Sequence, residues 1–162
     1  MILFDEEFNQ IKQILSRLRV DSNAKMVFLI DRNGQQIAAQ GDIENIDVTS
    51  LASLTAGNVA ATDGLARILG EKEFNGIFHE GKKESMFISL VGDRVVVVIS
   101  FDDRSSLGLV RLRVKKATLE LLKVLEDIVK KSEREKETFE AAGFESPFAE
   151  ITDEDIDSLF SE

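Results

Sequence analysis

The 162-residue chain has no cysteine, tryptophan or tyrosine, and it has one proline and one histidine. Without cysteine it can form no disulfide framework and no thiolate metal site, which fits the reducing cytoplasm. No apolar run reaches the roughly 18 residues that a membrane-spanning helix needs. The first residues lack the basic segment that opens a secretory signal peptide. We therefore expect a cytoplasmic protein with no membrane insertion.

Positive charge is also scarce, since 30 acidic residues oppose 20 basic ones and the net charge is −10. An acidic surface repels nucleic-acid phosphates and anionic lipid, so other proteins are the expected partners. The sequence contains no serine elbow, phosphate-binding loop, H-E-x-x-H pattern or EF-hand loop. His79 lies in a short apolar segment, where a structural or surface role is the usual one. We therefore expect no enzyme, no catalytic residue, no cofactor and no metal site.

The hydrophobic pattern predicts the element order α-β-β-α-β-β-β-α. Amphipathic helices are expected over residues 5–20, 48–69 and from Ser105 or Ser106 to about residue 131. Strands are expected over residues 24–30, 35–40, 74–79, 85–91 and 94–101. The tight turns between consecutive strands predict antiparallel pairing in an α+β fold with helices on both faces of the sheet. The unbroken apolar run of the last strand predicts a central position, covered on both faces.

The chain is expected to divide into a domain at 1–131, a charged linker at 132–149 and an acidic tail at 150–162, in which Ile156, Leu159 and Phe160 share one face of a short helix. Residues 145–162 hold seven acidic and no basic side chains, whereas residues 105–131 hold seven basic and three acidic ones. Two interpretations stay open. The first is that both segments are solvated charge runs. The second is that the tail docks on a basic surface, which is either its own last helix or a partner.

The helix at 48–69 has an unusual composition. Its leucine-rich side is expected to face the core: Leu51, Leu54, Leu65, Ile68 and Leu69. The opposite side is made mostly of small residues: Thr49, Ser53, Ala56, Gly57, Ala60, Asp63, Gly64 and Arg67. Each glycine costs a helix about 1 kcal/mol relative to alanine, and small side chains let another backbone approach. We therefore predict an interface here, with a second copy, a different protein or both; the alternative is that a loop of the same domain covers this side.

Four stretches carry a family resemblance: residues 25–35 (KMVFLIDRNGQ), 49–61 (TSLASLTAGNVAA), 105–113 (SSLGLVRLR) and 146–162. They resemble the Roadblock/dynein-light-chain family, and within it the MglB-like proteins of gliding bacteria. The resemblance covers nearly the whole chain and is least specific at 132–145. It implies a Roadblock fold: a five-stranded antiparallel sheet in the order 2-1-5-4-3, with two helices on one face and the 48–69 helix on the other.

The resemblance also implies a homodimer whose third strands pair edge to edge into one continuous sheet. Its two small-faced helices would form a platform for a Ras-like small GTPase of the MglA type in its GTP form, and Ile156, Leu159 and Phe160 would contact that GTPase elsewhere. The implied function is GTPase activation in cell polarity and gliding motility, at a cell pole, by rearrangement of the GTPase's own catalytic residues. Neither Arg67 nor Arg104 lies in a recognisable finger loop. The alternative is a non-catalytic Roadblock scaffold that binds a GTPase or a motor complex without changing nucleotide turnover.

Overall fold

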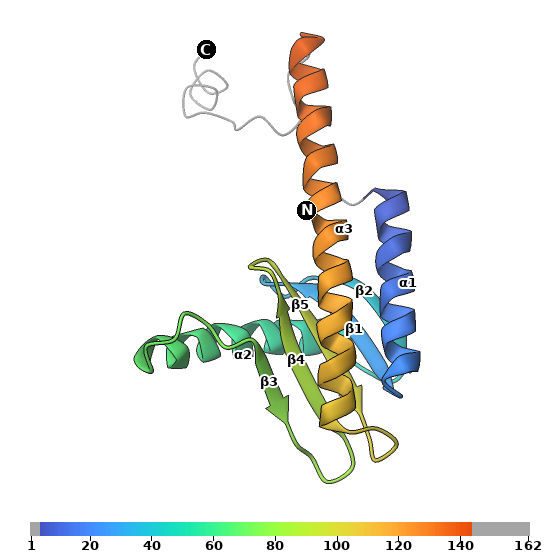
Figure 1. Ribbon diagram of the computed structural model, residues 1–162, viewed down its shortest axis with the longest axis vertical. Helices are drawn as coiled ribbons and strands as arrows, with labels where there is room; N and C mark the ends of the chain where they lie inside the picture. Colours follow the sequence, from blue (N-terminus) through green and yellow to red (C-terminus); the bar gives the residue numbers. More distant parts are fainter. Residues whose placement is uncertain (1–3, 144–162) are drawn as a thin grey trace, which may run out of the picture.

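Figure 1 shows a computed structural model of the protein, which describes residues 4–143. The elements follow the predicted order. They are α1 (Asp5–Asp21), β1 (Met26–Asp31), β2 (Gln36–Gly41), α2 (Val48–Ile68), β3 (Gly76–His79), β4 (Ser85–Val91), β5 (Val95–Phe101) and α3 (Leu107–Ala141). In the described part of the chain, no helix is both long enough and apolar enough to cross a membrane.

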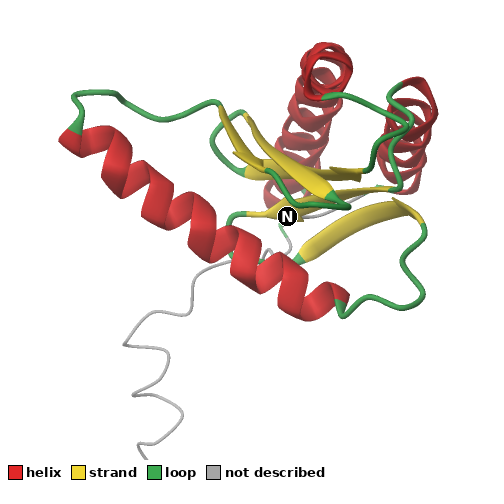
Figure 2. Ribbon diagram, turned by 90° about the horizontal axis from the view of Figure 1, so that it is seen from below, coloured by secondary structure: helices red, strands yellow, loops and turns green. Residues whose placement is uncertain are grey.

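The five strands form one antiparallel sheet in the order β2-β1-β5-β4-β3, which confirms the order implied by the family resemblance. Helices α1 and α3 cover one face of this sheet, and α2 crosses the other face (Figure 2). The molecule therefore has three layers, with a hydrophobic core on each side of the sheet.

The central strand β5 contributes side chains to both cores, because successive side chains of a strand point to opposite faces. Val95, Val97 and Ile99 pack in the core beneath α1 and α3. Val96 and Val98 pack in the core beneath α2. All residues of β5 are buried, which agrees with the prediction from its unbroken apolar run.

Capping residues mark both ends of α2 and the start of α3. Asp47 caps α2, since its Oδ1 accepts a hydrogen bond from the Ser50 backbone N–H at 3.1 Å. The hydrogen bonds from the Ser50 hydroxyl and backbone lower the pKa of the Asp47 carboxyl. Ser106 caps α3 in the same way through the Leu109 N–H. Gly70, at φ +79°, ends α2 in the left-handed conformation that glycine adopts without strain.

The predicted end of the last helix near residue 131 is wrong, because α3 continues to Ala141. The segment after residue 131 has no glycine or proline before Gly143, and its lysine, glutamate and arginine residues favour helix. α3 is also tied to α1, since Lys131 Nζ lies 2.5 Å from Oε1 of the buried Glu7. The hydrogen bond from Lys131 is the main cause of the lowered pKa of Glu7. Residues 144–149 and the tail lie outside the described residues.

Candidate protein-interaction site

Helix α2 meets the sheet through small residues, and the prediction that its leucine side faces the core is wrong. The buried residues are Ala52, Thr55, Val59 and Ala66. Ala52, Val59 and Ala66 recur every seven residues, so they form one row along the helix. Ala52 and Val59 pack in the core beneath α2, whereas the buried Ala66 belongs to neither core cluster. With this side toward the sheet, most of the leucines of α2 are left in solvent.

The leucine and isoleucine side chains of α2 and of its C-cap residue Leu69 are exposed to solvent, apart from the partly buried Leu51. The exposed fractions are 73% for Leu54, 58% for Leu65, 81% for Ile68 and 71% for Leu69. We call these four residues the α2 apolar stripe. The C-terminal half of α2, which carries Leu65 and Ile68 and is followed by Leu69, extends past the β3 edge of the sheet (Figure 1). Large exposed apolar groups of this kind mark interaction surfaces.

The predicted small-residue interface lies beside this stripe. Ser53, Gly57, Ala60 and Arg67 are exposed, and Ala56, Asp63 and Gly64 are partly buried. A Cβ added at Gly57 or at Gly64 would meet no atom within 4 Å, so nothing in the described chain requires glycine at either position.

One margin of the small-residue side is covered by the protein's own β1–β2 turn. A Cβ at Gly34 would lie 3.1 Å from the Ser53 Cα, so the turn backbone rests on α2 there. Arg32 of the same turn forms an ion pair with Asp63 at 3.4 Å and another with Glu73 at 3.8 Å. At this margin of the small-residue side, the alternative prediction is therefore correct, because a loop of the same domain covers the helix.

Strand β3 forms one edge of the sheet, next to the projecting half of α2 (Figure 1). It pairs with β4 on one side, from Gly76 opposite Ser89 to His79 opposite Met86. His79 also lies beside α2, with its Nε2 at 3.3 Å from Asn58 Nδ2. The backbone N–H and C=O groups on the outer side of an edge strand are available to pair with another chain. The α2 apolar stripe and this open edge therefore form adjoining parts of one surface.

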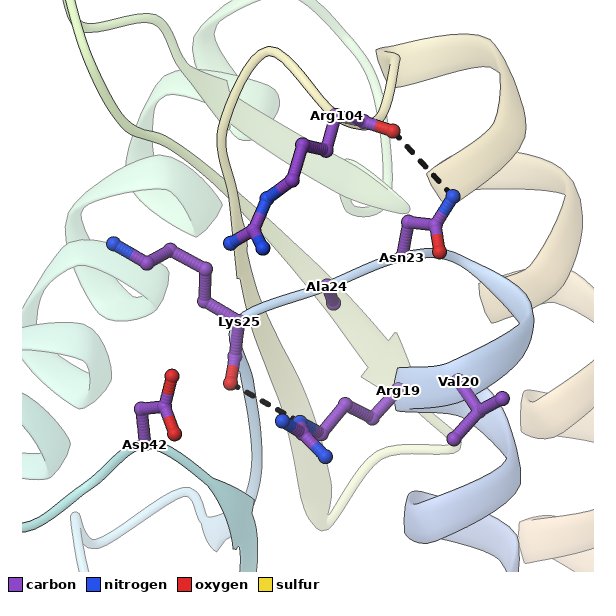
Figure 3. Close-up of a pocket in the computed structure, with 7 residues that line it drawn as sticks. All are labelled: Arg19, Val20, Asn23, Ala24, Lys25, Asp42 and Arg104. Atoms are coloured by element: carbon purple, nitrogen blue, oxygen red, sulfur yellow. Dashed lines mark hydrogen bonds between the residues drawn. The ribbon is translucent and has the colours of Figure 1, made fainter.

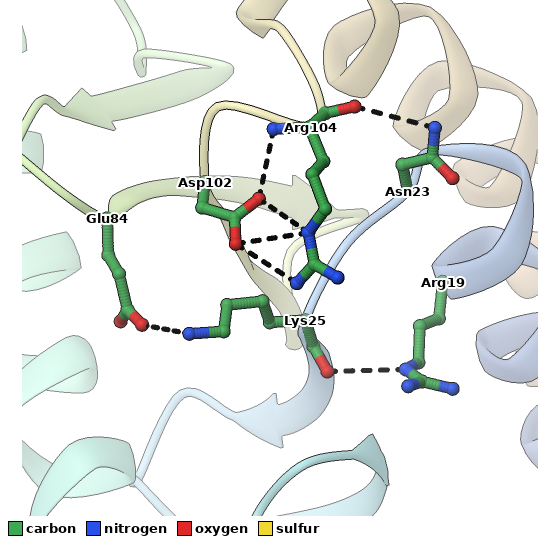
Figure 4. Close-up of polar contacts among 6 residues, drawn as sticks. All are labelled: Arg19, Asn23, Lys25, Glu84, Asp102 and Arg104. Atoms are coloured by element: carbon green, nitrogen blue, oxygen red, sulfur yellow. Dashed lines mark hydrogen bonds and ion pairs between the residues drawn. The ribbon is translucent and has the colours of Figure 1, made fainter.

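A polar pocket of about 280 Å³ lies at the N-terminal end of β1. Two arginines, Arg19 and Arg104, belong to its lining. Figure 3 shows its lining residues: Arg19, Val20, Asn23, Ala24, Lys25, Asp42 and Arg104. The cations of this pocket already have acceptors (Figure 4): Lys25 pairs with Glu84, and Arg19 Nε donates to the Lys25 carbonyl oxygen at 3.2 Å. The polar groups that line this pocket therefore bind each other and form a structural network.

Arg104 is held in this network and does not project as a finger. Its Nε and Nη2 donate to the Asp102 carboxylate at distances of 3.0 to 3.2 Å, and its carbonyl oxygen accepts from Asn23 (Figure 4). The hydrogen bonds from Arg104 lower the pKa of Asp102. Asp102 caps the turn before α3, whereas Ser106 caps the helix itself.

Within residues 4–143, no group of three or more histidine, cysteine, aspartate or glutamate side chains is placed to hold a metal ion. The tail residues that the sequence nominated, Ile156, Leu159 and Phe160, lie outside the described residues. The α2 apolar stripe is the feature that sequence reasoning assigned to the wrong side. The helical pattern does not identify the buried side, because alanines and leucines recur on different sides of α2 and either side could face the sheet.

A sheet of this order, flanked by two helices on one face and one on the other, defines a Roadblock-type domain. The family model described as "Roadblock/LC7 domain" matches residues 10–101. The chain belongs to the Roadblock/LC7 family.

Among solved structures, MglB of Myxococcus xanthus is 57% identical, with a TM-score of 0.74 over 78% of this chain and 96% of that one. The gliding protein MglB of Thermus thermophilus is 29% identical, with the same TM-score and coverage. A structure described as MglB with tetrameric arrangement is 28% identical over the same shares, also at 0.74. No curated protein matches the chain.

Proposed function

We propose that this protein is a homodimeric activator of a Ras-like small GTPase of the MglA type, with a role in cell polarity and motility. The observation that carries the proposal is the similarity to Myxococcus xanthus MglB, at 57% identity over most of the chain. The MglB-like proteins that the sequence resembles accelerate GTP hydrolysis by such a GTPase. The cytoplasm, and a cell pole within it, is the location that this role implies.

Dimerisation is proposed through the β3 edge and the α2 apolar stripe. Two antiparallel β3 strands would satisfy each other's outer backbone groups and remove an open sheet edge. A twofold axis at this edge would also bring the two projecting halves of α2 together. That arrangement accounts for the exposure of Leu65 and Ile68 in the single chain, because a leucine or isoleucine side chain gains about 1.5–3 kcal/mol when it is fully buried.

The GTPase is proposed to bind across the paired α2 helices, on the small-residue side at Ser53, Gly57, Ala60 and Gly64. These positions present little side-chain bulk, so a partner backbone can approach closely. Gly57 and Gly64 support this role because their own domain leaves the space above them open. Each lowers the stability of α2 by about 1 kcal/mol relative to alanine, a cost that partner contact would explain.

Activation is proposed to occur by positioning the GTPase's own catalytic groups. A finger arginine must be free to reach the transferred phosphate, whereas Arg104 is engaged by Asp102. Arg67 is exposed on α2 and is the remaining arginine considered for this role. An Arg67→Ala variant tests it directly: under the positioning mechanism, it loses much less acceleration than the roughly 10³-fold or more attributed to a finger.

The first experiment measures GTP hydrolysis by the cognate GTPase, with and without an excess of this protein. A rise of about tenfold or more, equivalent to 1.4 kcal/mol of transition-state stabilisation, supports activation. Gly64→Arg should abolish GTPase binding and acceleration while the fold is retained, since the space at Gly64 is open in the single chain. Arg104→Ala is the matched control and should retain both. Binding without any acceleration would replace the activator by a Roadblock scaffold.

A further inference from the structure

The outer face of α3 combines exposed leucines with one sign of charge. Between Leu109 and Leu125, six residues of this helix are exposed, and each is either leucine or basic. Leu112 and Leu119 are 62% and 66% exposed. The four basic residues are Arg111, Lys115, Lys116 and Lys123. We call these six residues the α3 basic face.

Three acidic residues of α3 adjoin this face: Glu120, and the exposed Glu126 and Asp127 that follow it. The seven basic residues of 105–131 outnumber these three, so the helix stays positive overall. Glu120 is partly buried and forms an ion pair with Arg17 of α1, at 3.1 Å. Helix α3, which carries this face, lies on the opposite side of the sheet from α2 (Figure 2). The α3 basic face is therefore a separate surface. A binding segment complementary to it would be acidic and would carry a few apolar side chains.

We propose that the occupant is the C-terminal segment of the same chain, residues 150–162. This segment contains six acidic residues and no basic one. It also carries Ile156, Leu159 and Phe160, whereas a segment that served only to solubilise the protein would need no large apolar groups. Its charge and its apolar content are both complementary to the α3 basic face.

The segment is long enough to reach that face. Leu119 precedes Gly143 by 24 residues, or about 36 Å along a helix. Ile156 follows Gly143 by 13 residues, which span about 43 Å when extended. The connection from Gly143 is therefore long enough to bring Ile156 back to Leu119.

This contact would compete with binding of the same segment to any partner protein. It requires neither a GTPase nor GTP, so it stands or falls independently of the proposed function. It is tested on the full chain alone, by hydrogen–deuterium exchange of the amides in residues 150–162.

In the wild type, these amides should exchange at least about tenfold more slowly than in Leu112→Ser/Leu119→Ser, since burial of a single leucine is worth that factor. Lys115→Glu/Lys116→Glu should also speed exchange, by charge repulsion. Lys82→Glu/Lys83→Glu is the matched control, because it makes the same charge change at exposed lysines of the β3–β4 turn, and it should leave exchange unchanged. Equal exchange in the wild type and both α3 variants would overturn the proposal.

Because the chain has no cysteine, an engineered disulfide distinguishes contact within one chain from contact between two. Leu119→Cys/Ile156→Cys should oxidise to a cross-linked species of monomer mass on a denaturing gel. A cross-linked species of dimer mass would assign the α3 basic face to the tail of a second copy and overturn docking within one chain.

Discussion

The double substitution Leu65→Ser/Ile68→Ser tests whether the α2 apolar stripe holds a dimer together. In the single chain these side chains are 58% and 81% exposed, so their replacement removes little from the core. Substitution of exposed residues usually changes folding stability by less than about 0.5 kcal/mol. The helix should therefore form normally in the variant, which far-ultraviolet circular dichroism checks.

The effect on association should be large. Burial of the exposed part of each side chain contributes about 1–2 kcal/mol. A twofold interface contains each residue twice, so four side chains contribute roughly 4 kcal/mol at the lower bound. At 1.4 kcal/mol for each factor of ten, the dimer dissociation constant should rise about a thousandfold.

Sedimentation velocity over a dilution series measures this shift. The matched control is Leu112→Ser/Leu119→Ser, which removes two similarly exposed leucines from the other layer of the molecule and should leave the dimer intact. Two results would refute the reasoning: a Leu65→Ser/Ile68→Ser protein that sediments as the wild type does, or a control that dissociates equally.

Three further predictions concern single positions and the tail. Gly64→Ala should raise the free energy of unfolding in urea by about 0.5–1 kcal/mol, whereas Gly34→Ala should lower it, because Gly34 has φ +87° and its Cβ would lie 3.1 Å from the Ser53 Cα. Lys131 lowers the pKa of Glu7 below its ordinary value of 4.5, so their pairing stabilises the fold above that pH and this stabilisation is lost as the pH falls further. Glu7→Gln should therefore be less stable than the wild type at pH 7. The difference in the free energy of unfolding should narrow when urea denaturation is repeated at more acidic pH. Truncation after residue 145 should leave dimerisation unchanged in sedimentation and weaken GTPase binding in a titration.

Much of the fold could be predicted from local signals. The Asn33-Gly34 turn and the period of the apolar residues placed the strands β1 and β2. The continuous apolar run before Phe101 indicated a strand buried on both faces, since polar alternation is lost only when both faces are covered. Asp47 and Gly70 marked the two ends of α2, because capping depends on a few adjacent residues.

The sequence by itself thus determined the order of the elements, the antiparallel pairing and the absence of cysteine chemistry, because those follow from neighbouring residues and composition. Tertiary structure alone decided which side of α2 packs on the sheet. A helical pattern with alanines on one side and leucines on another can be oriented either way, and in the fold the side that carries Ala52 and Val59 faces the sheet. That choice leaves Leu65 and Ile68 in solvent beside the open β3 edge. Local patterns do not contain this information, since it depends on how the whole helix packs against the sheet.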